Sequence, residues 1–261
     1  MSRIIAITNQ KGGVGKTTTT VNLAASLVAT KRRVLLVDLD PQGNATMGSG
    51  VDKNGLEVSC CDLLLGEAVA GEVMIYQEHI GYALLPSNSD LTAAEVALVN
   101  IEGRESRLAL ALQAVEDQFD YILIDCPPTL NMLTLNALVA AEGVIIPMQC
   151  EYYALEGLSA LVETIEQVRS TANPRLAIEG LLRTMFDPRN NLANEVSAQL
   201  INHFGDKVYR TVVPRNVRLA EAPSYGLPAI QYDKTSRGAL AYLALAGEIL
   251  RREANKSAEV A

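Results

Sequence analysis

The chain has 261 residues, of which 49% are hydrophobic, 20% are charged and 5% are aromatic, and its formal net charge is −8. This composition suffices for one large aliphatic core, and the acidic balance argues against nucleic-acid binding through bulk charge. The sequence contains no run of about 18 apolar residues and no recognisable signal peptide, and its four cysteines lack metal-ligand or disulfide-framework spacing. We therefore expect a protein of the reducing cytoplasm without a membrane span.

The negative charge is unevenly distributed. Residues 1–174 carry 10 Lys and Arg against 21 Asp and Glu, whereas residues 175–261 carry 12 against 9. The C-terminal third is therefore the only part that could present a basic face, although an ordinary solvated surface also explains a difference of this size.

The first element is a short apolar run, Ile4–Ile7, which predicts a buried strand. A glycine-rich stretch, Lys11–Thr18, follows it and leads into residues 19–29, where apolar side chains recur at helical spacing. Strand, glycine-rich loop and helix form the context of a phosphate-binding loop, in which backbone N–H groups and a helix N-terminus face an anion. In such a loop Lys16 reaches the phosphates and the Thr17 hydroxyl binds Mg²⁺. The alternative is a glycine-rich turn with two surface lysines.

This loop departs from the standard pattern G-x-x-x-x-G-K-[ST], because Gln10 stands where the first glycine belongs. A second lysine, Lys11, directly precedes Gly12 and Gly13. The loop therefore carries one lysine more than the standard pattern requires.

Two further predicted strands end in carboxylates. Residues 34–37 lead into Asp38–Asn44, and residues 121–124 end in Asp125 before two prolines. In open α/β sheets, ligands bind at the carboxyl ends of the strands. A hydrophobic strand ending in Asp is typical of a Walker B motif, whose carboxylate holds Mg²⁺ through a water. The alternative role for Asp125 is to cap the following helix.

The rest of the chain alternates strands and helices. Further strands are predicted at residues 83–85, 144–147, 177–185 and 208–213, and helices at residues 61–65, 91–99, 106–115, 131–140, 153–171, 191–204, 217–222 and 238–252. This alternation predicts a single-domain α/β fold over residues 1–254, with a mostly parallel twisted sheet and helices on both faces. Residues 255–261 are expected to form a frayed tail.

Four sequence blocks together resemble the ParA/Soj-type chromosome-partition ATPases of the ParA/MinD family, whose Walker A motif carries an additional lysine. The blocks are Lys11–Thr18, Asp38–Asn44, Ile122–Pro128 and Val213–Pro223. The last block, together with Arg183–Asp187, is similar to Soj-type members in particular. The resemblance extends over nearly the whole chain and implies a P-loop ATPase with slow intrinsic turnover.

The resemblance also implies a role for each motif, with ATP and Mg²⁺ as cofactors. Asp40 positions the attacking water; because a carboxylate is a weak base at neutral pH, we expect orientation rather than full proton abstraction. Lys11 acts across a dimer on the partner's nucleotide, as an arginine finger does. The implied phosphate contacts come from Gly12, Gly13, Val14, Gly15, Lys16, Thr17 and Thr18, the Mg²⁺ contacts from Thr17 and Asp125, and the adenine contacts from Met185, Pro214, Arg215 and Asn216.

The resemblance finally implies a switch that works on DNA. ATP bridges two subunits into a sandwich homodimer, the dimer binds double-stranded DNA without sequence preference, and a ParB-type centromere-binding partner stimulates hydrolysis and release. Arg189 and Arg218 are placed like the DNA-contacting arginines of Soj-type relatives. The protein is then expected in the cytoplasm, on the nucleoid and not on a membrane.

Two alternatives belong to other functional classes. One is a MinD-like membrane-cycling ATPase that helps to place the division site, and the other is a metabolic relative such as a dethiobiotin synthetase or a nitrogenase iron protein. A membrane-cycling protein of the first kind ends in a Lys/Arg-rich amphipathic helix. The apolar residues between 239 and 250 instead predict a helix broad enough to pack on a core.

Overall fold

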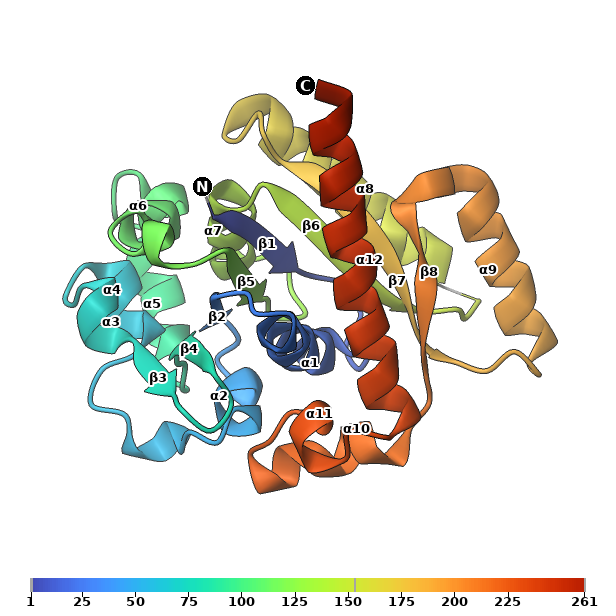
Figure 1. Cartoon of the computed structure of the whole chain (residues 1–261). Coiled ribbons are helices and arrows are strands. Elements are labelled where there is room, and N and C mark those ends of the chain that lie inside the picture. The colour runs from blue at the N-terminus through green and yellow to red at the C-terminus, as the bar shows by residue number, and fades with distance from the viewer. Residues whose placement is uncertain (1, 153, 261) are drawn as a thin grey trace.

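The computed structural model describes residues 2–152 and 154–260. Its described strands form one sheet of eight in the order β3–β4–β2–β5–β1–β6–β7–β8 (Figure 1). Within the described residues only the β3–β4 pair is antiparallel, which confirms the mostly parallel α/β sheet. The strands are β1 (Arg3–Ile7), β2 (Val34–Asp38), β3 (Ile75–Gln77), β4 (Tyr82–Leu85), β5 (Tyr121–Asp125), β6 (Gly143–Gln149), β7 (Ala177–Phe186) and β8 (Val208–Pro214).

Helices cover both faces of this sheet. One face packs against α1 and α12, which lie in front of the sheet in Figure 1, and the other packs against α3 and α5 to α9. The helices are α1 (Lys16–Ala29), α2 (Asn44–Gly48), α3 (Cys60–Leu65), α4 (Ala70–Val73), α5 (Leu91–Leu98), α6 (Arg107–Gln113), α7 (Met132–Ala140), α8 (Ala154–Thr171), α9 (Asn191–Phe204), α10 (Val217–Glu221), α11 (Ala229–Tyr232) and α12 (Arg237–Val260).

The central strands explain the continuous apolar runs of the sequence. Side chains of β1, β2 and β5 are buried on both faces of the sheet, so no polar alternation is needed. The parallel register pairs Ile7 with Asp125 and Asp38 with Asp125. The phosphate-loop segment after β1 and the two carboxylates therefore meet at the same edge of the sheet.

Some local features of the structure differ from the prediction, and one predicted helix begins at a residue outside the described part of the chain. Strand β3 was not predicted, because it is only three residues long and pairs at the edge of the sheet. Helix α12 continues to Val260, where the sequence predicts a frayed tail; Lys256 on this last part donates to the Glu179 carboxylate at 3.2 Å and so attaches it to β7. The helix predicted from Tyr153 is described from Ala154, and Tyr153 lies outside the described residues.

The closing helix α12 packs on the core, as predicted. Tyr242, Leu245 and Ile249 are fully or almost fully buried. Leu240 and Leu243, which the sequence assigns to the same packing face, are instead 52% and 37% exposed. The apolar helix face that a MinD-like protein inserts into a membrane is thus largely packed against the core in this chain. No helix in the described parts of the chain is both long and apolar enough to cross a membrane.

Candidate phosphate-binding site

The glycine-rich segment forms an open loop between β1 and α1. Gly13 and Gly15 have φ values of +75° and +88°, which side-chain-bearing L-residues rarely adopt. Apart from the glycine itself and its two chain neighbours, no described heavy atom lies within 4 Å of the position that a Cβ would take on Gly12 or Gly13. No side chain caps the N-terminus of α1, so its first-turn N–H groups remain available to an anion. This geometry fits a phosphate group.

Side chains far apart in sequence hold the loop in place. The Asn9 amide donates to the Pro147 carbonyl at 2.9 Å, while its oxygen accepts from the Lys11 N–H at 3.0 Å. On the other side of the loop the Thr184 hydroxyl donates to the Val14 carbonyl at 2.7 Å. The loop is therefore attached to β6 and β7 through hydrogen bonds that no local sequence pattern predicts.

Lys16 lies inside this loop and is 7% exposed. Its ammonium donates to the Lys11 carbonyl at 3.4 Å. Burial lowers the pKa of Lys16, although the nearby Asp125 and Asp40 carboxylates act in the opposite direction. The lysine therefore contacts the backbone of the loop and lies within reach of the charges of both carboxylates.

Asp125 ends β5 directly beneath the start of α1. Its carboxylate accepts from the Thr17 hydroxyl at 2.7 Å and from the Thr20 hydroxyl at 2.9 Å. Burial raises the pKa of Asp125, and the charge of Asp38 raises it further. The two residues predicted to hold Mg²⁺, Thr17 and Asp125, are therefore in direct contact. Thr20 was missed, although its position one turn after Thr17 places both residues on one face of the helix.

This donor set fits Mg²⁺. Asp40 and Asp125 lie close enough to the buried Lys16 for their charges to act on it. A hard divalent cation prefers oxygen ligands such as the hydroxyl of Thr17 and the carboxylate of Asp125. Within the described residues, no group of three or more His, Cys, Asp or Glu could hold a metal alone. Mg²⁺ usually takes only one or two protein ligands and completes its coordination with water and substrate phosphates, so one hydroxyl and one carboxylate fit it.

Asp40 is held near the loop by its own backbone. Its N–H donates to the Asp38 carboxylate at 3.1 Å, and its carbonyl accepts from the Ser87 hydroxyl at 2.8 Å. Its side-chain carboxylate accepts from the Gln42 N–H at 2.9 Å. Asp40 as a whole is 7% exposed. The carboxylate therefore has a fixed direction, as water orientation requires.

Lys11 points away from the interior of its own loop. Its ammonium forms an ion pair with the Glu151 carboxylate at 2.5 Å, and the two side chains are 42% and 52% exposed. Sequence reasoning missed Glu151; its place just after β6, at the carboxyl edge of the sheet, was the available signal.

The residues predicted to contact adenine come together at the ends of β7 and β8. Phe186, which follows Met185, pairs with Pro214 across these strands. Met185 has a φ of +48°, an uncommon left-handed conformation, and its sulfur accepts from the Gln149 amide. The side-chain oxygen of Asn216 is buried without a hydrogen-bond partner among the described residues. An adenine amino group is a suitable donor for such an oxygen.

The two predicted DNA-binding arginines do not belong to this loop. The Arg189 guanidinium is 88% exposed and pairs with Asp187 at 2.8 Å. The Arg218 guanidinium pairs with Glu221 at 2.7 Å and with Asp233 at 3.3 Å. Both arginines are on the surface, and both already have carboxylate partners.

Comparison with known proteins agrees with this geometry. A family model described as an AAA domain matches residues 2–178. The chain is 53% identical over 249 residues to the sporulation initiation inhibitor protein Soj of Bacillus subtilis, covering 95% of this chain and 98% of that protein. It is 51% identical over 257 residues to the chromosome partitioning protein ParA of Myxococcus xanthus, covering 98% and 91%. It also resembles the structure of cobyrinic acid a,c-diamide synthase from Mycobacterium smegmatis with bound ADP and magnesium, with a TM-score of 0.85, 39% identity and coverage of 96% and 95%.

Proposed function

The chain belongs to the ParA/Soj family of chromosome-partitioning ATPases, and we propose that it is an ATP-dependent switch for DNA segregation. In this proposal an ATP-bound homodimer binds DNA without sequence preference on the nucleoid, and a ParB-type partner stimulates hydrolysis and release. The similar structure from Mycobacterium smegmatis is named as a cobyrinic acid a,c-diamide synthase, an enzyme that forms amides. We favour the role in DNA segregation over amide formation, because the relatives at 51% and 53% identity over nearly the whole chain are partition proteins.

The observation that carries the switch is the separation of the two lysines of the loop. Lys16 is buried inside the loop, whereas Lys11 is exposed and lies on Glu151. A lysine that is not needed for its own phosphate site is available to a second subunit. Because an exposed ion pair contributes only about 0–1 kcal/mol, Lys11 can leave Glu151 at little cost when two subunits meet.

The other residues divide the work of the ATPase. Lys16 and the open N–H groups of the loop hold the phosphates, and Thr17 with Asp125 holds Mg²⁺. Bound Mg²⁺ neutralises charge on the phosphoryl oxygens. Asp40 orients the attacking water, and the unpartnered oxygen of Asn216 accepts from the adenine amino group. Lys11 of the partner subunit stabilises the charge that develops on the transferred group.

We expect Lys11→Ala to reduce ATP hydrolysis by roughly a thousandfold, as removal of an arginine finger does. ATP binding by the variant should change little, because Lys16 and the loop remain. A phosphate-release assay and an ATP titration measure the two effects, with exposed Lys234→Ala as the charge-matched control.

A mixing experiment separates action across the dimer from action within one subunit. Lys11→Ala lacks the donated lysine, whereas Asp40→Ala lacks the group that orients water but keeps Lys11. A mixed dimer therefore contains one complete site only if Lys11 acts on the partner's nucleotide. Hydrolysis that reappears on mixing supports the proposal, and a mixture as inactive as either variant contradicts it.

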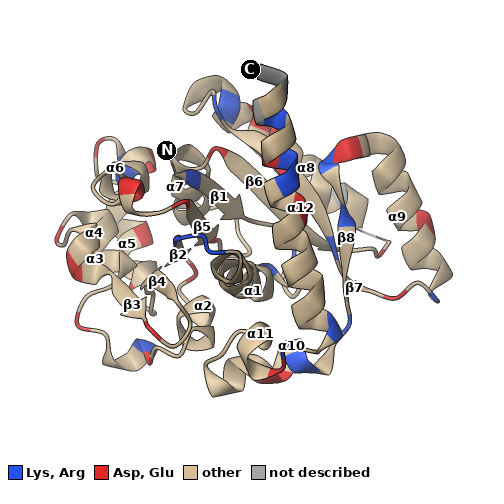
Figure 2. Cartoon of the chain, viewed as in Figure 1, with Lys and Arg blue, Asp and Glu red and all other residues tan. Residues whose placement is uncertain are grey.

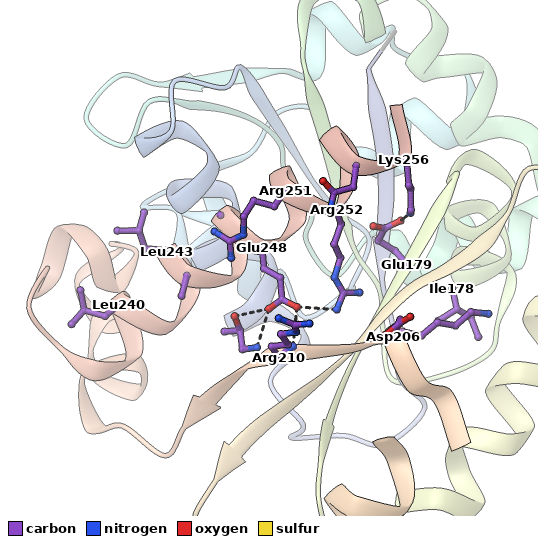
Figure 3. Close-up of a pocket in the computed structure, with 15 residues that line it drawn as sticks. Ile178, Glu179, Asp206, Arg210, Leu240, Leu243, Glu248, Arg251, Arg252 and Lys256 are labelled. Atoms are coloured by element: carbon purple, nitrogen blue, oxygen red, sulfur yellow. Dashed lines mark hydrogen bonds and ion pairs between the residues drawn. The ribbon is translucent and has the colours of Figure 1, made fainter. Parts of the chain in front are cut away.

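The DNA surface must be local, because the whole chain carries a net charge of −8. Lys and Arg gather on β8, on α12 and around α10 (Figure 2). A groove of about 1060 Å³ lies between α12 and β8, and Lys207, Arg210 and Arg251 line it (Figure 3). Within the described residues the charged side-chain groups of these three residues form no ion pair with a carboxylate. They can therefore extend the surface formed by Arg189 and Arg218.

We expect DNA binding by the wild-type protein only with ATP, because a dimer doubles the basic surface and raises avidity. The double variant Arg189→Ala/Arg218→Ala should bind DNA more weakly. For this variant the slope of log affinity against log salt concentration should be less steep by roughly one unit for each phosphate that each subunit no longer neutralises. Fluorescence anisotropy in a salt titration measures both effects, and ATP-dependent dimerisation should be retained.

Arg175→Ala is the matched control for this experiment, since Arg175 is also exposed and also paired with a carboxylate, Glu142. Unchanged DNA affinity in the double variant would show that DNA binds to a surface other than that of Arg189 and Arg218. In that case Arg210→Ala/Arg251→Ala in the α12–β8 groove is the next variant to test. Equal DNA binding with ADP and ATP would contradict the switch itself.

A further inference from the structure

We infer that Thr184 on β7 is a positioning residue for the phosphate loop. Its hydroxyl donates to the Val14 carbonyl at 2.7 Å, across 170 residues of chain. Thr184 is 2% exposed and Val14 is 1% exposed, so water does not compete for this hydrogen bond. The inference rests on the proposed ATP site and names a residue that no motif of the loop contains.

The geometry of the peptide bond gives this hydrogen bond its consequence. The peptide that joins Val14 to Gly15 is planar and trans, so its carbonyl and its N–H point in opposite directions. Because Thr184 holds the carbonyl toward β7, the Gly15 N–H is turned to the other side of the loop. A phosphate-binding loop requires N–H groups that face the anion.

Gly15 makes this control necessary. Its φ of +88° is accessible to glycine, and glycine is also the residue with the greatest backbone freedom. A Cβ built on Gly15 would lie 3.9 Å from the Thr184 methyl group, so the Thr184 side chain lies directly beside this peptide. Thr184 thus restricts a peptide that would otherwise have several orientations, and the loop is ordered before the nucleotide arrives.

The test compares two substitutions at one position. Thr184→Val keeps the shape and loses the hydroxyl, whereas Thr184→Ser keeps the hydroxyl and loses the methyl group. We expect Thr184→Val to raise the Kd for both ATP and ADP by at least about fivefold. Thr184→Ser should stay within about twofold of the wild type. Calorimetric titration with each Mg²⁺–nucleotide gives the Kd values.

A purely structural role is distinguished by a matched control. Thr134 is 1% exposed and its hydroxyl also donates to a backbone carbonyl, that of Thr129, at 2.6 Å. Thr134→Val should lower the Tm, as Thr184→Val does, but leave nucleotide affinity unchanged. If Thr184→Val lowers only the Tm, or if Thr184→Ser loses as much affinity as Thr184→Val, the inference is wrong.

Failure of this inference and failure of the proposed function give different results. A wild-type protein that does not bind ATP contradicts the proposed function. A wild-type protein that binds ATP together with a Thr184→Val variant of equal affinity contradicts only the role of Thr184. If Thr184→Val does not fold, the comparison of Thr184→Ser with Thr184→Ala under the same conditions gives the same decision.

Discussion

Lys16→Ala should lose ATP binding, with an affinity at least about a hundredfold below that of the wild type. The triphosphate brings several negative charges into a site that already contains Asp40 and Asp125. Lys16 is the buried cation between them, and truncating one partner of a buried charge pair costs about 2–5 kcal/mol. The backbone N–H groups of the loop supply only partial charges and cannot replace it.

Calorimetric titration of Lys16→Ala with Mg²⁺–ATP measures this loss. Lys234→Ala, which removes an exposed lysine, controls for the change in net charge and should bind ATP normally. A thermal melt is needed beside it, because the variant leaves the neighbouring carboxylates without their cation. A folded Lys16→Ala protein that binds ATP tightly would refute the nucleotide site.

The elements that could be predicted from sequence are those with local causes. Strands β1, β2 and β5 are central and buried on both faces, so each appears as an uninterrupted apolar run. The phosphate loop is recognisable because its glycines and lysines are consecutive. The parallel register then brings Asp125 beside the loop, which is why a Walker B carboxylate could be expected before its hydrogen bond to Thr17 was known.

The contacts that could not be predicted join distant parts of the chain. Glu151 reaches Lys11 across 140 residues, and Thr184 reaches Val14 across 170. Neither residue belongs to the phosphate-loop motif, and its contact with the loop depends on which strands are neighbours in the folded sheet. Strand β3 and the last turns of α12 depend in the same way on tertiary partners, since β3 exists by pairing with β4 and Lys256 is attached to Glu179.

The polar support around Asp40 has the same origin. The Ser87 hydroxyl comes from the end of β4 and reaches the Asp40 carbonyl only because β4 lies beside β2. The Asp38 carboxylate in turn accepts from the N–H and the hydroxyl of Thr46. This network fixes the backbone of Asp40 through atoms that a side-chain substitution at Asp40 does not remove.

For this reason Asp40→Ala should bind ATP and dimerise but not turn over. The hydrogen bonds to Asp38 and Ser87 use the Asp40 main chain and persist in the variant, so the loop should keep its shape. Only the carboxylate is lost, which the Gln42 N–H holds in a fixed direction.

Loss of a group that orients or deprotonates the attacking water lowers the rate by about 10²–10⁴. The variant should therefore accumulate as an ATP-bound dimer in size-exclusion chromatography, with a phosphate-release rate reduced by at least a factor of about 100. Asp40→Asn provides the shape-matched comparison, because an amide can still accept from the Gln42 N–H but carries no charge. Hydrolysis by Asp40→Ala at the wild-type rate would assign the water to another group, and a monomeric Asp40→Ala protein with weak ATP affinity would make Asp40 a residue of binding rather than of hydrolysis.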